Sequence, residues 1–387
     1  MTSLPRSRLP RRSTVDPSPV SALRIEVPGE RRRPSRAWHV IRQLSRLLRP
    51  VPALGPGTLA LAIYAHPGGP QFDLRAAAES GYEGVACVDD ASRAALLYTE
   101  IWHRHGFAWA REAAEGLLRF TCAMQLDGGA FVNFIASWDG ERQLTTPTSR
   151  PGGGPWQARA MHALARGVAV FGAQPYAAAF EAGVPTLLTP TPSLDVRALS
   201  AIAMLEYWQA TAAPSAAAHA LAWAEEIAAA RIGDLLPDRA GSSDMHLWGH
   251  LQEAALARIG VALGRDDLVR AAARSADTGL APAGERACAG PQSLAFDVSC
   301  TIAGLEAVAA ATGEARYASL AASARSWFDG RNTARQPVYD RDRGLVRDGI
   351  DGNRLSENSG AESNIEGGLA LINTLPWAQI EAAMVQA

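Results

Sequence analysis

Two adjacent acids at a predicted helix start are the residues in this sequence best suited to chemistry. Asp89 and Asp90 precede a long apolar run, and Arg93 follows three residues after Asp90. One aspartate is enough to cap a helix, because its carboxylate accepts the free backbone N–H groups of the first turn. A second acid and an arginine are more than capping requires. We expect one aspartate to cap the helix, while Asp90 faces a substrate and Arg93 holds it in orientation.

Glu362 is the best partner for Asp90. It begins a predicted helix after an Asn-Ser-Gly loop, and Glu366 follows one turn later. Paired carboxylates cleave glycosidic bonds, because one protonates the leaving oxygen while the other activates water or attacks the sugar. We therefore expect Asp90 and Glu362 to be catalytic. The simpler alternative for Glu362 is a capping role, and for Asp89, Asp90 and Arg93 it is a cap with a local ion pair.

Polar residues stand at every other predicted helix start. Six unrelated caps would favour Ser, Thr and Asp, but they would not call for arginine, tryptophan or histidine. We expect these starts to converge on one funnel and to contact a substrate there. The set comprises Asp89 with Asp90, Trp156 with Arg159, Asp195 with Arg197, Asp244 with His246, Asp297, and Asn358 with Glu362.

Aromatic and basic residues near these starts suit sugar binding. Trp138 and Asp139 lie at a predicted turn, and Trp156 follows a glycine-rich loop, so that an aromatic face could stack on a sugar ring. The alternative is a place in the core, where tryptophan is more often found. Arg159 and Arg197 suit sugar hydroxyls or the carboxylate of an acidic sugar, and the alternative for both is an ion pair with nearby acids.

A histidine pair offers the main alternative chemistry. His246 and His250 lie four residues apart on a predicted helix with Glu253 nearby, a spacing that can bind zinc. Neither an HExxH motif nor a third ligand is evident, so we expect no metal site. His246 with an acid such as Asp244 could instead transfer protons in a sugar epimerase or isomerase. Since no glycine-rich nucleotide loop follows a strand, no cofactor is expected.

Apolar residues recur at helical spacing along most of the chain from Asp89 onward. Ala130–Trp138 is expected to be extended and to end in a hairpin turn, and residues 50–80 are expected to form a loop-rich segment. The predicted helices are Asp89–His105, Ala108–Gln125, Trp156–Phe171, Pro175–Ala182, Leu194–Ala210, Ala213–Arg231, Asp244–Leu263, Asp266–Thr278, Leu294–Ala311, Ala315–Phe328 and Glu362–Leu375, with a last one at Ala378–Gln386.

Helix pairs without sustained strands predict an all-α fold, either an open solenoid or a closed toroid. Open solenoids usually repeat a consensus, whereas these pairs differ in detail. The recurrent polar starts favour a closed (α/α)6 toroid, in which six helical hairpins form a ring, with one short β-hairpin-like insertion. A terpene-cyclase toroid is a further alternative, but its funnel would be apolar and aromatic.

Charge divides the 387-residue chain into two parts. Residues 1–50 contain twelve Arg and three acids, so the overall net charge of −2 leaves −11 for the remainder. We expect residues 1–50 to be a basic, largely disordered segment with a short helix at Ala37–Leu48, and residues 51–387 to be a single toroid domain. We interpret the basic segment as a solvated tail rather than a tether, and expect no nucleic-acid partner.

Composition excludes several reaction classes. All 37 basic residues are arginine, so the chain offers no Schiff-base or P-loop lysine. The four cysteines, Cys87, Cys122, Cys288 and Cys300, form no CxxC pair, and reduced thiols are expected. No apolar run approaches 18 residues, so neither a transmembrane segment nor a strong secretion signal is expected. The predicted location is cytoplasmic.

Four motifs in matching order resemble one known domain family. Val88-Asp-Asp-Ala-Ser-Arg-Ala-Ala-Leu resembles a DDNARAL motif, although Ser92 stands where Asn is usual. Pro155-Trp-Gln-Ala-Arg-Ala-Met-His-Ala-Leu resembles a GRALWALG-type helix, and Ser193-Leu-Asp-Val-Arg-Ala-Leu an SPRALA start. Asn358-Ser-Gly-Ala-Glu-Ser-Asn-Ile-Glu resembles an NQGAESTLAFLLAL end. The chain is thus similar to the (α/α)6 toroid domain found alone or fused to bacterial glycosyltransferases, within the six-hairpin glycosidase-like superfamily.

The resemblance implies a carbohydrate-active protein. Together with the paired acids, it favours glycoside hydrolase-like processing of a glycan in a central funnel by a carboxylate pair. Two alternatives stay open: a sugar epimerase or isomerase that uses His246 and an acid, and a non-catalytic domain that binds glycan or serves a glycosyltransferase. The expected partners are a carbohydrate and, by resemblance, a glycosyltransferase.

Overall fold

The computed structural model describes residues 39–68, 71–79, 81–375 and 377, all within one unit, Pro34–Ala387. The expected disordered stretch over residues 1–35 and the expected last helix, Ala378–Gln386, lie outside the described residues. The division at residue 50 therefore stays a prediction.

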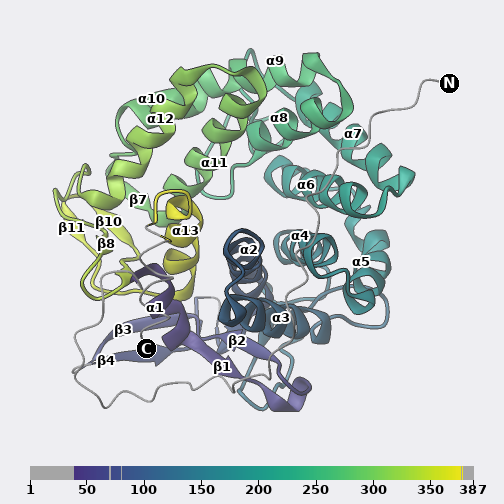
Figure 1. Ribbon diagram of the computed structural model, residues 1–387, viewed down its shortest axis with the longest axis vertical. Helices are drawn as coiled ribbons and strands as arrows, with labels where there is room; N and C mark the ends of the chain where they lie inside the picture. The colour runs from purple at the N-terminus through teal and green to yellow at the C-terminus, as the bar shows by residue number, and fades with distance from the viewer. Residues whose placement is uncertain (1–38, 69–70, 80, 376, 378–387) are drawn as a thin grey trace. The chain divides into compact units, whose positions relative to one another are not determined.

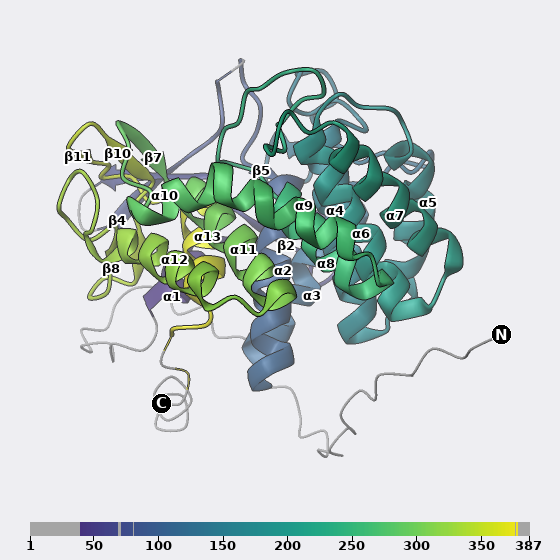
Figure 2. The ribbon, with the colours of Figure 1, turned by 90° about the horizontal axis from the view of Figure 1, so that it is seen from above.

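Six inner helices form a closed ring (Figure 1). Each inner helix packs against the next, and α13 packs back against α2, which closes the ring. The long loops gather on one side of the helices, next to the short strand from which α2 starts (Figure 2). The inner helices are α2 (Val88–His105), α4 (Gly154–Phe171), α6 (Leu194–Thr211), α8 (Gln252–Leu263), α11 (Ala295–Thr312) and α13 (Ala361–Leu371).

Each inner helix has an outer partner. The first five partners follow their inner helices directly in the chain, whereas α13 packs against α1, which comes from the start of the described residues. The outer helices are α3 (Ala108–Ala123), α5 (Gln174–Leu187), α7 (Pro214–Ala229), α9 (Asp266–Ser275), α12 (Ala315–Arg325) and α1 (His39–Leu47). Helix α9 continues through a π-helical turn (Ala276–Leu280) into α10 (Ala281–Glu285), and a 3-10 turn (Ser326–Asp329) follows α12.

Local sequence explains where several of these helices end. Helix α2 ends at Gly106 and α4 at Gly172, which have φ of +71° and +62° respectively. Glycine adopts this left-handed conformation without steric cost, so its N–H can bond back to the last turn. Inner helix α6 is apolar on nearly all sides because it is buried between α4, α7 and α8.

One helix is apolar enough to resemble a membrane span. Among the described residues, α11 is the single helix whose length and composition would allow it to cross a membrane, whereas the sequence analysis expected none. Its place in the inner ring between α8 and α13 accounts for that composition, since an inner helix buries most of its surface.

Short strands lie between and before the helices. The segment expected to be loop-rich contains a two-stranded pair, β1 (Leu48–Pro50) with β2 (Leu59–Leu61), a 3-10 turn (Pro52–Leu54) and a hairpin, β3 (Tyr64–Gly68) with β4 (Gln71–Arg75). That expectation was wrong, because the pairing of such short strands leaves no clear pattern in the sequence. The other strands are β5 (Ala86–Cys87) with β6 (Phe134–Ile135), β7 (Gln292–Leu294) with β10 (Gly349–Asp351) and β11 (Arg354–Leu355), and β8 (Tyr339–Asp340) with β9 (Leu345–Val346).

Two predicted elements differ most in extent from the observed ones. The extended stretch predicted at Ala130–Trp138 is a strand only at β6, which pairs with β5. The helix predicted to start at Asp244 begins at Gln252 instead, and the residues before it form a loop. The carboxylate of Asp238 accepts the backbone N–H of His246, and this bond holds the chain in a non-helical path.

Candidate active site at the starts of the inner helices

The start of α2 leaves both of its aspartates free to bind something other than the helix. Cys87 is the N-cap residue, and its sulfur accepts the backbone N–H of Asp90 at 3.4 Å. The side-chain oxygen of Asn133 accepts the N–H of Asp89 at 3.1 Å. The expectation that one aspartate caps the helix was therefore wrong, because a thiol and an amide fill that role.

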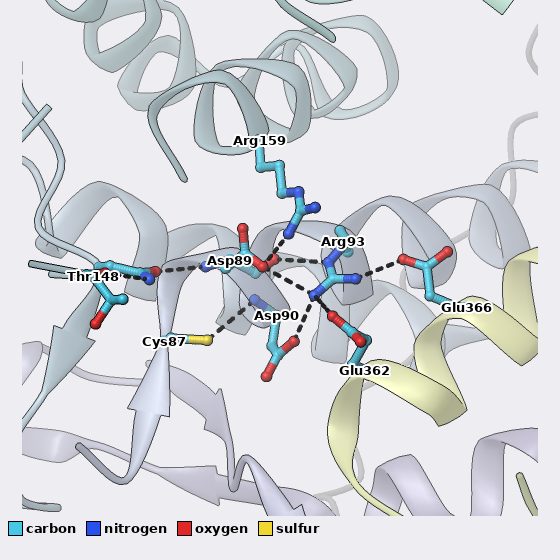
Figure 3. Close-up of polar contacts among 9 residues, drawn as sticks. Cys87, Asp89, Asp90, Arg93, Thr148, Arg159, Glu362 and Glu366 are labelled. Atoms are coloured by element: carbon cyan, nitrogen blue, oxygen red, sulfur yellow. Dashed lines mark hydrogen bonds and ion pairs between the residues drawn. The ribbon is translucent and has the colours of Figure 1, made fainter. Parts of the chain in front are cut away.

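Arg93 forms ion pairs with four carboxylates (Figure 3). Its Nη2 lies 3.0 Å from Asp89 Oδ2 and 2.9 Å from Asp90 Oδ1. The same nitrogen lies 3.1 Å from Glu362 Oε2 on α13, and Nη1 donates to Glu366 Oε1 at 2.8 Å. Only 7% of the Arg93 side chain is exposed. We call these four acids with Arg93 the acid cluster.

A second arginine and an aromatic ring complete the acid cluster's surroundings. Arg159, from the first turns of α4, forms an ion pair with Asp89 Oδ2. The Phe296 ring of α11 lies under both guanidinium groups, 4.9 Å from Arg93 and 5.2 Å from Arg159. Contacts of this kind between a cation and an aromatic face are attractive. The starts of α2, α4, α11 and α13 therefore meet at one place, and these are four of the six starts that the sequence analysis expected to converge.

The acid cluster holds more acids than arginines, and burial shifts their proton affinities. Burial raises the pKa of Asp90 to about 7; Arg93 opposes this shift, and the charges of Asp89 and Glu362 add to it. Burial also raises the pKa of Glu366, against the pull of Arg93. Burial alone would lower the pKa of Arg93, but the surrounding carboxylates outweigh it and raise that pKa well above its usual value.

Asp90 and Glu362 lie close together but differ in access. Because both contact one nitrogen of Arg93, at 2.9 and 3.1 Å, the two carboxylate oxygens are at most about 6 Å apart. Asp90 is nearly buried, whereas 45% of the Glu362 side chain is exposed. Glu362 is therefore the member of the pair that a ligand reaches first.

The loop before α8 brings more polar groups to the same end of the ring. Asp297, at the start of α11, accepts the backbone N–H of Leu294 at 2.7 Å, and the backbone N–H of Trp248 lowers the pKa of its carboxyl. Burial raises the pKa of Asp297 and of Asp195, and the charge of His246 acts in the opposite direction on both. His246 is therefore close enough to influence both Asp195 and Asp297.

Several predicted site residues serve the scaffold instead. Trp156 is 7% exposed and donates its indole N–H to the Phe131 carbonyl at 3.0 Å, so its face is not available to a sugar. Arg197 is buried and pairs with Glu226 of α7 at 3.1 Å, with its guanidinium over Trp223. These contacts fit the alternative stated for Arg197, which was a structural ion pair with a nearby acid.

Other predicted residues lie in loops with local partners. Asp244 is exposed and accepts the hydroxyl of Ser242 at 2.7 Å, as turn residues do. Trp138 packs its ring against the core, and Asp139 beside it is exposed. The backbone N–H of Asn358 donates to a neighbouring serine in the loop before α13. A sugar-binding role for these four residues stays a prediction.

His246 and His250 do not share a helix face. His250 is fully buried, with Nδ1 2.7 Å from Asp238 Oδ1 and Nε2 2.8 Å from Glu253 Oε2. Burial lowers the pKa of His250, but these two acids outweigh it and raise the pKa to about 10. In the part of the chain that the structure describes, no group of three or more His, Cys, Asp or Glu residues could hold a metal ion.

Sequence reasoning missed two aromatic residues of this site, Phe296 and Trp248. Phe296 stands next to Asp297 in the sequence, but only ring closure brings it under the arginines of α2 and α4. Trp248 lies two residues after His246, in a segment predicted to be helical, and its exposure follows from the loop found there. Once the loop is known, the half-exposed side chain of Trp248 next to the polar helix starts identifies it as a site residue.

The fold resembles known sugar-processing enzymes. No protein-family model matches the sequence, and no curated protein matches it either. A sugar epimerase from a ruminal bacterium matches with a TM-score of 0.64 and 13% identity, over 87% of this chain and 96% of that chain. A family 76 glycoside hydrolase from a bovine Bacteroides thetaiotaomicron strain matches with a TM-score of 0.60 and 10% identity, over 91% and 77% of the two chains.

A third match contains a bound sugar. It is an α-1,6-mannanase from a Salegentibacter species, inactive through replacement of two consecutive aspartates by asparagine, in complex with α-1,6-mannotriose. Its TM-score is 0.56 at 8% identity, over 87% of this chain and 97% of that chain. These likenesses confirm the (α/α)6 toroid fold that the sequence predicted.

Proposed function

We propose that this protein acts on carbohydrate and cleaves a glycosidic bond at the acid cluster. The observation that carries the proposal is the pair Asp90 and Glu362, which share one nitrogen of Arg93 and lie at most about 6 Å apart where the inner helices start. The structural matches support the carbohydrate assignment, because they are sugar epimerases and glycoside hydrolases. One of them is inactive when two consecutive aspartates are replaced together by asparagine, and this chain carries the consecutive pair Asp89 and Asp90.

Asp90 has the proton affinity that a general acid needs near neutral pH, because burial raises its pKa to about 7. In the proposed reaction Asp90 gives its proton to the glycosidic oxygen as the C–O bond breaks, and the Glu362 carboxylate attacks the anomeric carbon. Water then cleaves the glycosyl ester and returns a proton to Asp90. A separation below the roughly 6.5–9.5 Å of inverting enzymes favours this retaining course.

The charge of the acid cluster favours a neutral sugar. Arg93 and Arg159 already pair with carboxylates of this chain, and four acids outnumber these two arginines. A sugar carboxylate would therefore meet net negative charge and no free guanidinium within the acid cluster. The acidic sugar considered from the sequence is not supported.

A hydrolysis screen tests the proposal. Wild type, Glu362→Gln and Asp90→Asn are incubated with a panel of neutral oligosaccharides that includes α-1,6-mannotriose, and products are followed by chromatography. We expect both variants to lose at least a hundredfold in turnover while they still bind sugar. The anomer formed first, observed by NMR, should keep the configuration of the substrate.

Glu357→Gln is the matched control, because Glu357 is an exposed acid in the loop just before α13. It should turn over sugar as wild type does. Unchanged turnover in Glu362→Gln and Asp90→Asn would contradict hydrolysis at the acid cluster, and binding without turnover in wild type would favour the non-catalytic alternative.

Epimerisation is the second candidate because of His246. Its ring is 37% exposed on the loop that faces Asp297, and imidazole can take up and return a proton near neutral pH. A reducing sugar incubated in D2O would then exchange the proton next to its carbonyl, which NMR detects. His246→Asn should abolish that exchange, and exchange that survives the substitution would contradict this candidate.

We also propose, from the sequence resemblance, that a glycosyltransferase is a partner and that the protein is cytoplasmic. The resemblance alone supports the partner. The location is supported by the four cysteines, which are all free. Co-purification of a tagged chain from its own host would test the partner, and fractionation of that host would test the location.

A further inference from the structure

We propose that Trp248 is the stacking platform for one sugar ring beside the acid cluster, and that the buried residues Asp238, His250 and Glu253 hold it there. The inference rests on the carbohydrate function proposed above and adds a binding residue to it. Its ligand is the apolar C–H face of a neutral pyranose.

Trp248 is exposed in a way that packing does not explain. It is 48% exposed, although most tryptophans in folded proteins are largely buried. The imidazole of His246 covers one side of its ring, with centroids 4.1 Å apart and an angle of 6° between the planes. The indole is therefore fixed in orientation while much of its surface stays open, as a stacking surface requires.

Trp248 and the acid cluster share one wall. The Trp248 and Phe296 rings are 6.5 Å apart, and the guanidinium groups of Arg93 and Arg159 also contact the Phe296 ring. The backbone N–H of Trp248 is also near enough to the Asp297 carboxylate, at the start of α11, to lower its pKa. A sugar ring on Trp248 would thus lie beside the acid cluster.

The loop that carries Trp248 is held by buried charges. Asp238 bonds His250 Nδ1 and, through its other oxygen, the backbone N–H of His246. Glu253, at the start of α8, forms an ion pair with His250 Nε2 at 2.8 Å and accepts the hydroxyl of Ser275 from α9. These bonds tie the loop to two helices, on both sides of Trp248.

Charged residues are an expensive way to fix a loop, which argues for a positional role. His250 and Glu253 are fully buried and Asp238 nearly so, and desolvation of such groups often outweighs their attraction. Apolar packing would hold a loop at least as stably. What the charged arrangement adds is directional bonding, which sets the orientation of the loop and so of Trp248.

Binding measurements with three variants test the platform. Trp248→Ala, Trp248→Phe and the control Val261→Ala are made in the Glu362→Gln background, so that sugar binds without turnover. Val261 is 60% exposed near the far end of α8, away from the loop. Affinity for α-1,6-mannotriose and cellobiose is measured by calorimetry. We expect Trp248→Ala to weaken binding roughly tenfold or more. The affinities of Trp248→Phe and Val261→Ala should stay within about threefold of the Glu362→Gln parent.

Kinetics test the positioning residues. His250→Gln should raise KM and leave kcat nearly unchanged, because it releases the platform but not the acids. Combined with Trp248→Ala it should add little to the effect of Trp248→Ala alone, since both act on one contact. Should His250→Gln not fold, Ser275→Ala is the substitute, because it removes one support of Glu253. It should raise KM by a smaller factor and again leave kcat nearly unchanged.

The outcomes separate the platform from the proposed hydrolysis. Equal sugar affinity of Trp248→Ala and its parent overturns the platform, even if Glu362→Gln abolishes turnover. Loss of affinity in Trp248→Ala together with full turnover in Glu362→Gln overturns hydrolysis and leaves the platform standing. Absence of sugar binding by all proteins overturns the platform and favours a protein partner for Trp248.

Discussion

At the scale of single residues, Arg93 determines the character of the site. It neutralises only part of the charge of four carboxylates, so protons must supply the rest, and Asp90 is the acid whose pKa burial raises to about 7. A carboxyl with that pKa changes its protonation state near neutrality, which gives the acid cluster a pH dependence that an exposed aspartate lacks.

Asp90→Asn should become more stable relative to wild type as pH rises. The pKa of Asp90 is about 7 when folded and near its ordinary 3.8 when unfolded, so its contribution to stability is complete below the lower value and lost as pH rises through 7. Asparagine does not titrate. Melting temperatures from pH 4 to 8 measure the effect, with exposed Asp139→Asn as control, and a difference that moves in favour of wild type would contradict it.

Arg93→Met should destabilise the fold strongly at pH 7. It leaves four partly or fully buried carboxylates without their common partner, which typically costs about 3–5 kcal/mol. The loss should shrink in mild acid as these groups take up protons. Urea denaturation measures it, and Arg104→Met, whose partially exposed ion pair with Glu100 contributes at most about 1 kcal/mol, is the comparison. Equal losses in the two variants would contradict this account.

At the scale of elements, the turns and loops that precede the inner helices decide which side chains reach the site. The helices themselves follow local rules, but each loop depends on a distant contact. The loop before α8 depends on Asp238, and the turn after α3 depends on Gly129, whose φ is +83° and whose α-carbon faces the carbonyl of Ala182 on α5.

Gly129→Ala should cost far more than Gly172→Ala, although both glycines have positive φ. A Cβ at Gly129 would lie 1.8 Å from the Ala182 oxygen, whereas a Cβ at Gly172 would meet no atom within 4 Å. Gly172→Ala should therefore cost about 1 kcal/mol, from backbone strain alone. Gly129→Ala must also displace a backbone. Urea denaturation midpoints compare the two, and equal shifts would show that the turn yields without cost.

At the scale of the whole molecule, closure of the ring creates the site. Helix α13 needs a partner on its outer side, and α1, from the beginning of the described chain, supplies it. Leu44 and Leu47 of α1 are buried in the core, and the Gln43 side chain donates to the Ser359 carbonyl at 3.0 Å, just before α13. Residues before position 50 therefore support the helix that carries Glu362.

Leu44→Ala tests whether α1 belongs to the toroid. Truncation of a fully buried leucine should cost about 2–5 kcal/mol. The exposed Leu144→Ala should change stability by less than about 0.5 kcal/mol. Chemical denaturation measures both. A neutral Leu44→Ala would mean that residues 1–50 form a separate segment, as the sequence alone suggested.

The sequence by itself determined the helices and their polar starts. Apolar spacing and terminal glycines such as Gly106 act within one or two turns, so they can be recognised in a short window. Only the tertiary structure decided which of the polar helix starts lie together at the site. Arg93 and Glu366 are 273 residues apart, and Trp156 and Arg197 turn into the core while Phe296 and Trp248 reach the site. No local interaction specifies such pairings, because they exist only once α13 packs against α2 and closes the ring.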